Sequence, residues 1–142
     1  MTSPTTYAGE ITPTETWNRL RTQANAKLVD VRTQAEWSFV GVPDLSSIDK
    51  QPLLVSWQAF PTMARNDAFA AQLEAQGVRK DDVLLLLCRS GVRSKAAAEH
   101  LTALGYTEAW NITDGFEGPH DQSRHRGITA GWKASNLPWA QG

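Results

Sequence analysis

The only cysteine of the chain, Cys88, stands in a sequence that favours a nucleophilic role. It ends the apolar run VLLLL and begins the segment CRSGVRS, residues 88–94. A thiol reacts as the thiolate, and its ordinary pKa of ~8.5 keeps it mostly protonated at neutral pH. Arg89, Arg93 and Lys95 bring three positive charges within seven residues of the sulfur. Nearby positive charges favour the anion, so the spacing predicts an activated thiol.

The backbone of the same segment adds to this effect. No residue between Cys88 and Ser94 is proline, so each can donate a backbone N–H. Gly91 permits a sharp turn that makes these groups converge, and the helix expected from Ser94 directs the positive end of its dipole at the loop. The alternative is a core cysteine, but a core residue needs neither a glycine turn nor arginines. The segment therefore predicts an anion cradle around Cys88, formed by Arg89, Ser90, Gly91, Val92, Arg93 and Ser94.

Short strands alternate with helices on both sides of this segment. Such alternation is typical of a parallel α/β sheet, and an apolar run without alternation suits a strand buried on both faces. Ligand sites of these sheets lie beyond the carboxyl ends of the strands, where Cys88 falls. Expected helices cover residues 13–21, with Thr12 as N-cap, 67–76 and 94–104, and expected strands cover residues 27–31, 52–57, 83–87 and 108–112.

Composition limits the class of protein. The chain has 142 residues, of which 41% are hydrophobic and 20% charged, which suits one domain over residues 1–142 with residues 1–10 loose. The net charge of −1 predicts binding to neither nucleic acid nor a membrane. A single cysteine forms no internal disulfide, and neither a signal peptide nor a membrane-spanning run is visible. We therefore expect a cytoplasmic protein.

CRSGVRS resembles the active-site loop of the rhodanese-domain sulfurtransferases, in which the cysteine accepts a sulfane sulfur as a persulfide. The resemblance extends over about residues 10–140 and implies a single rhodanese-like α/β domain. Its fold would be an open, mostly parallel five-stranded sheet with helices on both faces. Further segments resemble that family in the same order, namely LVDVRTQAEW (28–37), VP (42–43), NITDGF (111–116) and GWKASNLP (131–138).

The resemblance implies a double-displacement reaction without a cofactor. Cys88 would take the outer sulfur of thiosulfate or of a persulfide donor and pass it to cyanide or a thiol. A sulfur-relay protein is a candidate partner. We expect thiosulfate:cyanide sulfurtransferase-like activity.

Charged side chains near the loop have expected supporting roles. Arg89 and Lys95 are candidates to steer an anionic donor. Arg93 either binds the substrate or braces the loop by pairing with an acidic residue. Asp30 and Arg32, at the end of a neighbouring strand, are candidates for such bracing, and an ordinary turn salt bridge is the alternative for these two.

Two further features surround the expected pocket. Trp57 follows a strand end and is a candidate to line the pocket mouth, with a place in the core as the alternative. More residues separate Gly115 from Trp132 than in small rhodaneses, so we expect residues 116–131 to form an inserted loop. This loop holds His120 and His125 but few further ligands, and we expect no metal site.

Two other functions stay open. Cysteine phosphatases and arsenate reductases of the related fold resemble this loop but place five residues between cysteine and arginine. Here four residues separate Cys88 from Arg93, which favours a persulfide over a phosphoryl group. The second alternative is a persulfide carrier or binding module that hands sulfur to a dedicated partner with negligible turnover.

Overall fold

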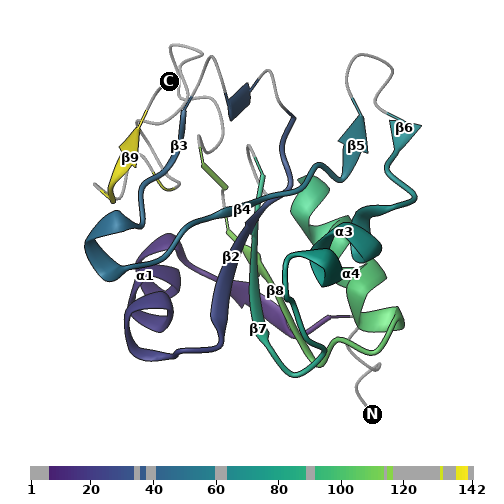
Figure 1. Cartoon of the computed structure of the whole chain (residues 1–142), viewed down its shortest axis with the longest axis horizontal. Coiled ribbons are helices and arrows are strands. Elements are labelled where there is room, and N and C mark those ends of the chain that lie inside the picture. Colours follow the sequence, from purple (N-terminus) through teal and green to yellow (C-terminus); the bar gives the residue numbers. More distant parts are fainter. Residues whose placement is uncertain are drawn as a thin grey trace.

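The computed structural model describes residues 7–33, 36–37, 41–59, 64–88, 92–113, 115–116, 132 and 137–140. Its centre is a five-stranded sheet with the order β1-β8-β7-β2-β4, in which every neighbouring pair is parallel (Figure 1). The predicted fold class is therefore confirmed. The strands are β1 (Gly9–Ile11), β2 (Ala26–Asp30), β4 (Leu53–Leu54), β7 (Val83–Leu87) and β8 (Glu108–Ile112).

Helices cover both faces of this sheet. Helix α1 (Pro13–Thr22) packs on one face, and α3 (Phe69–Ala75) and α4 (Val92–Ala103) lie on the other (Figure 1). Thr12 caps α1 because its hydroxyl accepts the Glu15 N–H at 3.1 Å, as the sequence TPTE predicts. The short elements are η1 (Ser46–Ile48), the antiparallel pair β3 (Val42–Pro43) and β9 (Trp139–Ala140), and the antiparallel pair β5 (Gln58–Ala59) and β6 (Ala64–Arg65).

Strand β7 joins two hydrophobic cores. Leu84 and Leu86 pack in the core under α3 and α4, whereas Leu85 and Leu87 pack in the core under α1. All five side chains of β7 are buried, because this central strand has a layer of helices on each side. The alternation of side chains along a strand places Cys88 in the same core as Leu84 and Leu86, and so on the α4 side of the sheet.

Two expectations about the sheet need correction. Residues 9 and 10 belong to β1, which pairs with β8, so the prediction of a loose segment over residues 1–10 is wrong for these two. The strand expected over residues 52–57 consists only of Leu53 and Leu54, at the edge of the sheet. Leu54 stays 39% exposed there.

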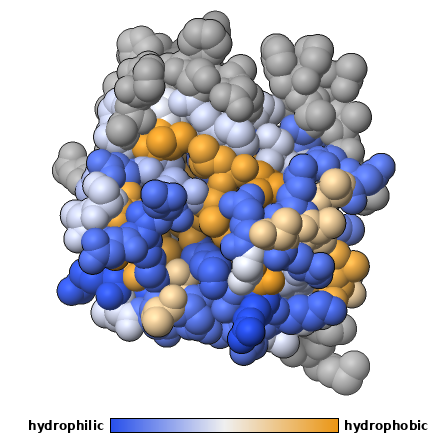
Figure 2. Space-filling view, in the orientation of Figure 1, coloured by the Kyte–Doolittle hydropathy of each residue, from blue (hydrophilic) through white to orange (hydrophobic). Residues whose placement is uncertain are grey.

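Apolar residues gather in a band across the face of the molecule shown in Figure 2.

Other boundaries agree with the sequence or lie close to it. Strands β7 and β8 have the predicted bounds, and α4 begins at Val92, two residues before the expected start. Within the predicted insertion over residues 116–131, only Phe116 is among the described residues, and it is fully buried. No helix in the described part of the chain is long and apolar enough to cross a membrane.

Candidate active site

Cys88 lies directly beyond the carboxyl end of β7, between the ends of β2 and β8. Its side chain is 1% exposed and not part of a disulfide. The backbone fixes this position from the β8 side, because the Phe116 N–H donates to the Cys88 carbonyl at 2.7 Å. The predicted loop residues Arg89, Ser90 and Gly91 lie outside the described residues, as does the side chain of Val92.

Ser94 brings a hydroxyl to the thiol. It lies in the first turn of α4, is fully buried, and its Oγ is 3.2 Å from Cys88 Sγ. Helix α4 starts only four residues after Cys88, so the sulfur is close to the positive end of the helix dipole. The structure thus places a hydroxyl group and the N-terminus of a helix next to the sulfur.

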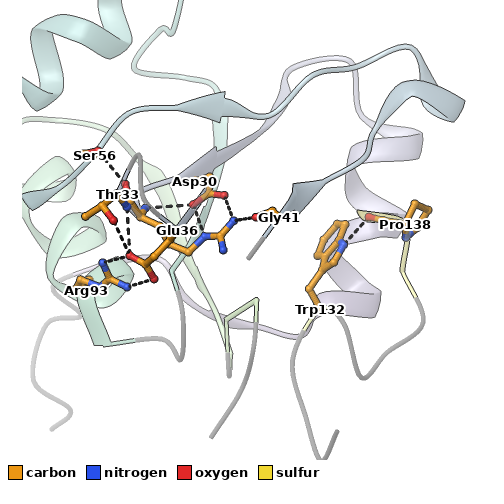
Figure 3. A network of polar contacts seen from close by, with 9 residues as sticks. Asp30, Thr33, Glu36, Gly41, Ser56, Arg93, Trp132 and Pro138 are labelled. Carbon is orange, nitrogen blue, oxygen red and sulfur yellow. Dashed lines mark hydrogen bonds and ion pairs between the residues drawn. The ribbon is translucent and has the colours of Figure 1, made fainter. Parts of the chain in front are cut away.

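Arg93 braces the site through Glu36. Its two terminal nitrogens donate to the two carboxylate oxygens of Glu36 at 2.8 and 2.9 Å (Figure 3). Both side chains are 18% exposed, and Glu36 also accepts hydrogen bonds from the backbone N–H and hydroxyl of Thr33. A bidentate pair of this kind fixes orientation as well as contributing energy. Of the two predicted roles for Arg93, the geometry supports bracing.

The pKa values of this pair move in opposite directions. Burial raises the pKa of Glu36, but the hydrogen bonds and charge of Arg93, the Thr33 N–H and the charge of Arg32 outweigh it, so the pKa is lowered. The hydrogen bonds from Arg93 to Glu36 raise the pKa of Arg93 against the effect of burial, and charges on Glu36, Cys88 and Asp30 add to this rise. The guanidinium therefore stays charged close to the sulfur.

Asp30 and Arg32 form a separate, fully buried ion pair. Arg32 Nε and Nη2 donate to the Asp30 carboxylate at 2.9 and 2.7 Å, and Nη2 also donates to the Gly41 carbonyl at 2.7 Å (Figure 3). The guanidinium lies 4.3 Å from the centre of the Phe116 ring. The two residues thus pair with each other and not with Arg93. The contacts therefore agree with the alternative of a salt bridge within the turn, although the pair is buried, with both side chains 0% exposed.

Sequence comparison shows which known proteins the chain is similar to. A family model described as the STR4 middle domain matches residues 8–142. An uncharacterised protein from Rickettsia rickettsii is 39% identical over 129 residues, covering 91% of this chain and 94% of that protein.

Structural comparison adds two solved neighbours. Rv0390 from M. tuberculosis superposes with a TM-score of 0.85 at 47% identity, covering 96% of this chain and 99% of that one. A rhodanese-like domain protein from Staphylococcus aureus superposes with a TM-score of 0.56 at 26% identity, covering 75% of this chain and 86% of that one. The chain belongs to the rhodanese-like family.

Of the two positions open to Trp57, the core and the pocket mouth, this rhodanese-like domain has Trp57 in the core. Its side chain is 8% exposed and lies in the core with Cys88. The indole packs edge-on against Phe69 and at a tilt against His100, with ring centres 5.3 Å apart in both cases. Because residues of α3 and α4 pack against its ring, Trp57 is a core residue in the described structure. Lys95 is exposed on α4, which leaves its predicted steering role open.

Sequence reasoning assigned no role to Glu36, although a signal was present. Thr33 and Glu36 are three residues apart, in the order typical of a capping box, and Glu36 indeed accepts the Thr33 N–H at 3.3 Å. The same segment was part of the family resemblance. Asn111 contacts Ser94, and Glu10 contacts Asn111. Neither had a predicted role, because Glu10 was placed in a loose N-terminal segment and Asn111 was noted only as part of the segment NITDGF.

The Glu36–Arg93 pair predicts a specific pH dependence of stability. The pKa of Glu36 is lowered in the folded state. The stabilisation it gives is therefore complete above the unfolded-state pKa of about 4.3 and is lost as pH falls through the lower folded-state pKa. We expect Glu36→Gln to reduce the free energy of unfolding by about 1–3 kcal/mol at pH 7.

Urea unfolding of wild type and Glu36→Gln at several pH values between 7 and 3 checks this prediction. The difference between the two proteins should shrink below about pH 4, because the wild-type carboxylate then becomes protonated. Glu15 offers a matched control, because it is an exposed carboxylate without an ion pair among the described contacts, and Glu15→Gln should show no comparable dependence. A difference that grows as the pH falls would contradict the assigned role.

Proposed function

We propose that this chain is a sulfurtransferase that moves a sulfane sulfur from thiosulfate or a similar donor to a thiophilic acceptor through a persulfide on Cys88. The observation that carries the proposal is the position of Cys88. It is held at the carboxyl end of β7, 3.2 Å from the Ser94 hydroxyl and close to the first turn of α4. Membership of the rhodanese-like family supports it.

The proposed reaction consists of two displacements at sulfur. The Cys88 thiolate attacks the outer sulfur of thiosulfate, a new S–S bond forms, and the donor's own S–S bond breaks with its electron pair leaving on sulfite. Cys88 then carries a persulfide whose outer sulfur is anionic. An acceptor such as cyanide or a thiolate attacks that outer sulfur, and the electron pair of the breaking bond returns to Cys88 Sγ. No general base is required when the thiol is already ionised.

The role of Arg93 separates this proposal from phosphate chemistry. A cysteine phosphatase needs an arginine whose nitrogens face the oxygens of the phosphoryl group. Both terminal nitrogens of Arg93 instead donate to Glu36, and Arg93 follows Cys88 after only four residues. Both features favour transfer of a single sulfur atom over transfer of a phosphoryl group.

Steady-state kinetics test the proposal. With thiosulfate and cyanide both varied, we expect thiocyanate formation with parallel double-reciprocal lines, as a two-step displacement requires. p-Nitrophenyl phosphate should not be hydrolysed. Phosphate release without thiocyanate formation would refute sulfur transfer and revive the phosphatase alternative. A persulfide that forms but passes to cyanide only slowly would instead indicate a dedicated carrier.

A further inference from the structure

A continuous line of hydrogen bonds leads from Cys88 to the protein surface. The Ser94 hydroxyl lies between Cys88 Sγ and Asn111 Oδ1 and contacts both. Asn111 Nδ2 donates to both carboxylate oxygens of Glu10, at 3.0 and 3.1 Å. Glu10 is exposed and accepts a further hydrogen bond of 2.6 Å from the Tyr7 hydroxyl. The line is built into the sheet, because Glu10 of β1 and Asn111 of β8 are direct partners in the strand pairing.

Glu10 fixes the orientation of the Asn111 amide. An ionised carboxylate only accepts hydrogen bonds, so the NH₂ group of Asn111 must face it and the carbonyl oxygen must face Ser94. Tyr7 agrees with this arrangement, since the hydrogen bond to Glu10, together with burial and the charges of Glu10 and Glu99, raises the pKa of Tyr7 to about 12. The phenol therefore remains a donor and Glu10 remains the acceptor.

The Ser94 hydroxyl has one proton and two acceptors to share it between. When Cys88 Sγ is a thiolate, the Ser94 hydroxyl donates its proton to the sulfur. Ser94 Oγ and Asn111 Oδ1 then lie next to each other with no proton between them, which is unfavourable. When Sγ is neutral, the proton is best placed toward Asn111 Oδ1. This second condition holds for the thiol and also for the inner sulfur of a persulfide, whose charge is on the outer sulfur.

We propose that Asn111, oriented by Glu10, is a positioning residue that competes with Cys88 for the Ser94 proton and so favours the states in which Sγ carries no charge. The consequence for sulfur transfer rests on the proposed function. Release of the outer sulfur to an acceptor returns the charge to Sγ, which is the state that Asn111 opposes. The line of contacts therefore helps Cys88 to retain its persulfide until an acceptor arrives.

Among the described residues, the other charged groups near Cys88 belong to neighbouring elements, and none of their described contacts is with Asn111. Arg93 on α4 is paired with Glu36, and Asp30 and Arg32 at the end of β2 are paired with each other. Lys95 on α4 is exposed. The Ser94 hydroxyl is the described group that contacts both Cys88 and Asn111, so a Ser94→Ala background identifies its share of any change in Cys88 reactivity.

The pH dependence of Cys88 alkylation by iodoacetamide tests the proposal without any sulfur donor. We expect Asn111→Leu to move the midpoint of this profile to lower pH by about one unit, because the Ser94 proton is then free to serve the thiolate. Glu10→Ala should move it in the same direction, since the amide can turn its NH₂ group toward Ser94. Because Glu10 is exposed, this variant keeps the test open if Asn111→Leu fails to fold.

Two controls separate this positioning role from a general effect. Glu99→Gln removes a charge near Tyr7 without touching the line of contacts, and it should leave the midpoint almost unchanged. In a Ser94→Ala background the effect of Asn111→Leu should disappear, because the shared proton is gone. An unchanged or raised midpoint in both Asn111→Leu and Glu10→Ala, or the same shift in the Ser94→Ala background, would overturn the proposal.

A second measurement addresses persulfide retention. After loading with thiosulfate, the Asn111→Leu protein should lose its sulfur to cyanide about tenfold faster than wild type. A factor of ten corresponds to the one-unit shift expected for the alkylation midpoint. If no persulfide forms in either protein, the proposed function fails while the alkylation result still stands. If the persulfide forms but is lost at equal rates, the retention role fails while sulfur transfer stands.

Discussion

Replacing Cys88 by serine is expected to lower thiosulfate:cyanide sulfur transfer at least about 1,000-fold. A serine hydroxyl is nearly always protonated at neutral pH and forms no persulfide, so the first displacement cannot occur. Cys88 is the only cysteine of the chain, and no second thiol can replace it. The measurement is thiocyanate formation from thiosulfate and cyanide by the purified proteins.

Two comparisons make this result specific. Cys88→Ser changes one buried atom, so its urea unfolding midpoint should stay close to that of wild type, which excludes unfolding as the cause of inactivity. Lys95→Ala removes an exposed charge on α4 and should retain turnover, with any loss appearing mainly in the Michaelis constant for thiosulfate if Lys95 steers the donor. A folded Cys88→Ser protein with a tenth or more of wild-type turnover would contradict the role of Cys88.

Asp30→Asn is expected to have the largest effect on stability, about 3–5 kcal/mol. Asp30 accepts hydrogen bonds from Arg32 N, Nε and Nη2, and both side chains are 0% exposed. The variant retains the shape of the side chain but leaves the Arg32 guanidinium charged without its counterion. Breaking a buried pair is costly because the remaining charge stays desolvated.

Urea unfolding measures this loss, and the Lys27–Asp82 pair provides the control. Lys27 contacts Asp82 at 2.6 Å, but its side chain is 30% exposed. Lys27→Met should therefore cost less than about 1 kcal/mol. An equally small cost for Asp30→Asn would show that the buried pair does not hold the end of β2, and that the site is braced by other contacts.

The position and bounds of a strand could be predicted where its own residues form a clear apolar pattern. The run VLLLL is apolar without alternation, and β7 is buried on both faces with the expected bounds. β1 was missed because GEI is short and partly polar, and its strand conformation depends on pairing with β8. β4 is shorter than expected because it is an edge strand that pairs only with β2.

The candidate site was predictable only in its local part. Cys88, Ser94 and Arg93 are close in sequence, and the loop motif drew attention to all three. The partner of Arg93 is Glu36, 57 residues away, and only the fold brings the two together. The position of Trp57 also depends on the fold, because a tryptophan at a strand end can face either a pocket or the core. The packing of Phe69 and His100 against its ring decides for the core.

Intact mass spectrometry of the protein after incubation with thiosulfate tests the central claim most directly. Wild type should gain the mass of one sulfur atom, lose it again on addition of cyanide, and show no gain in the Cys88→Ser variant. A wild-type protein whose mass stays unchanged, or a Cys88→Ser protein that gains the same mass, would contradict a persulfide on Cys88.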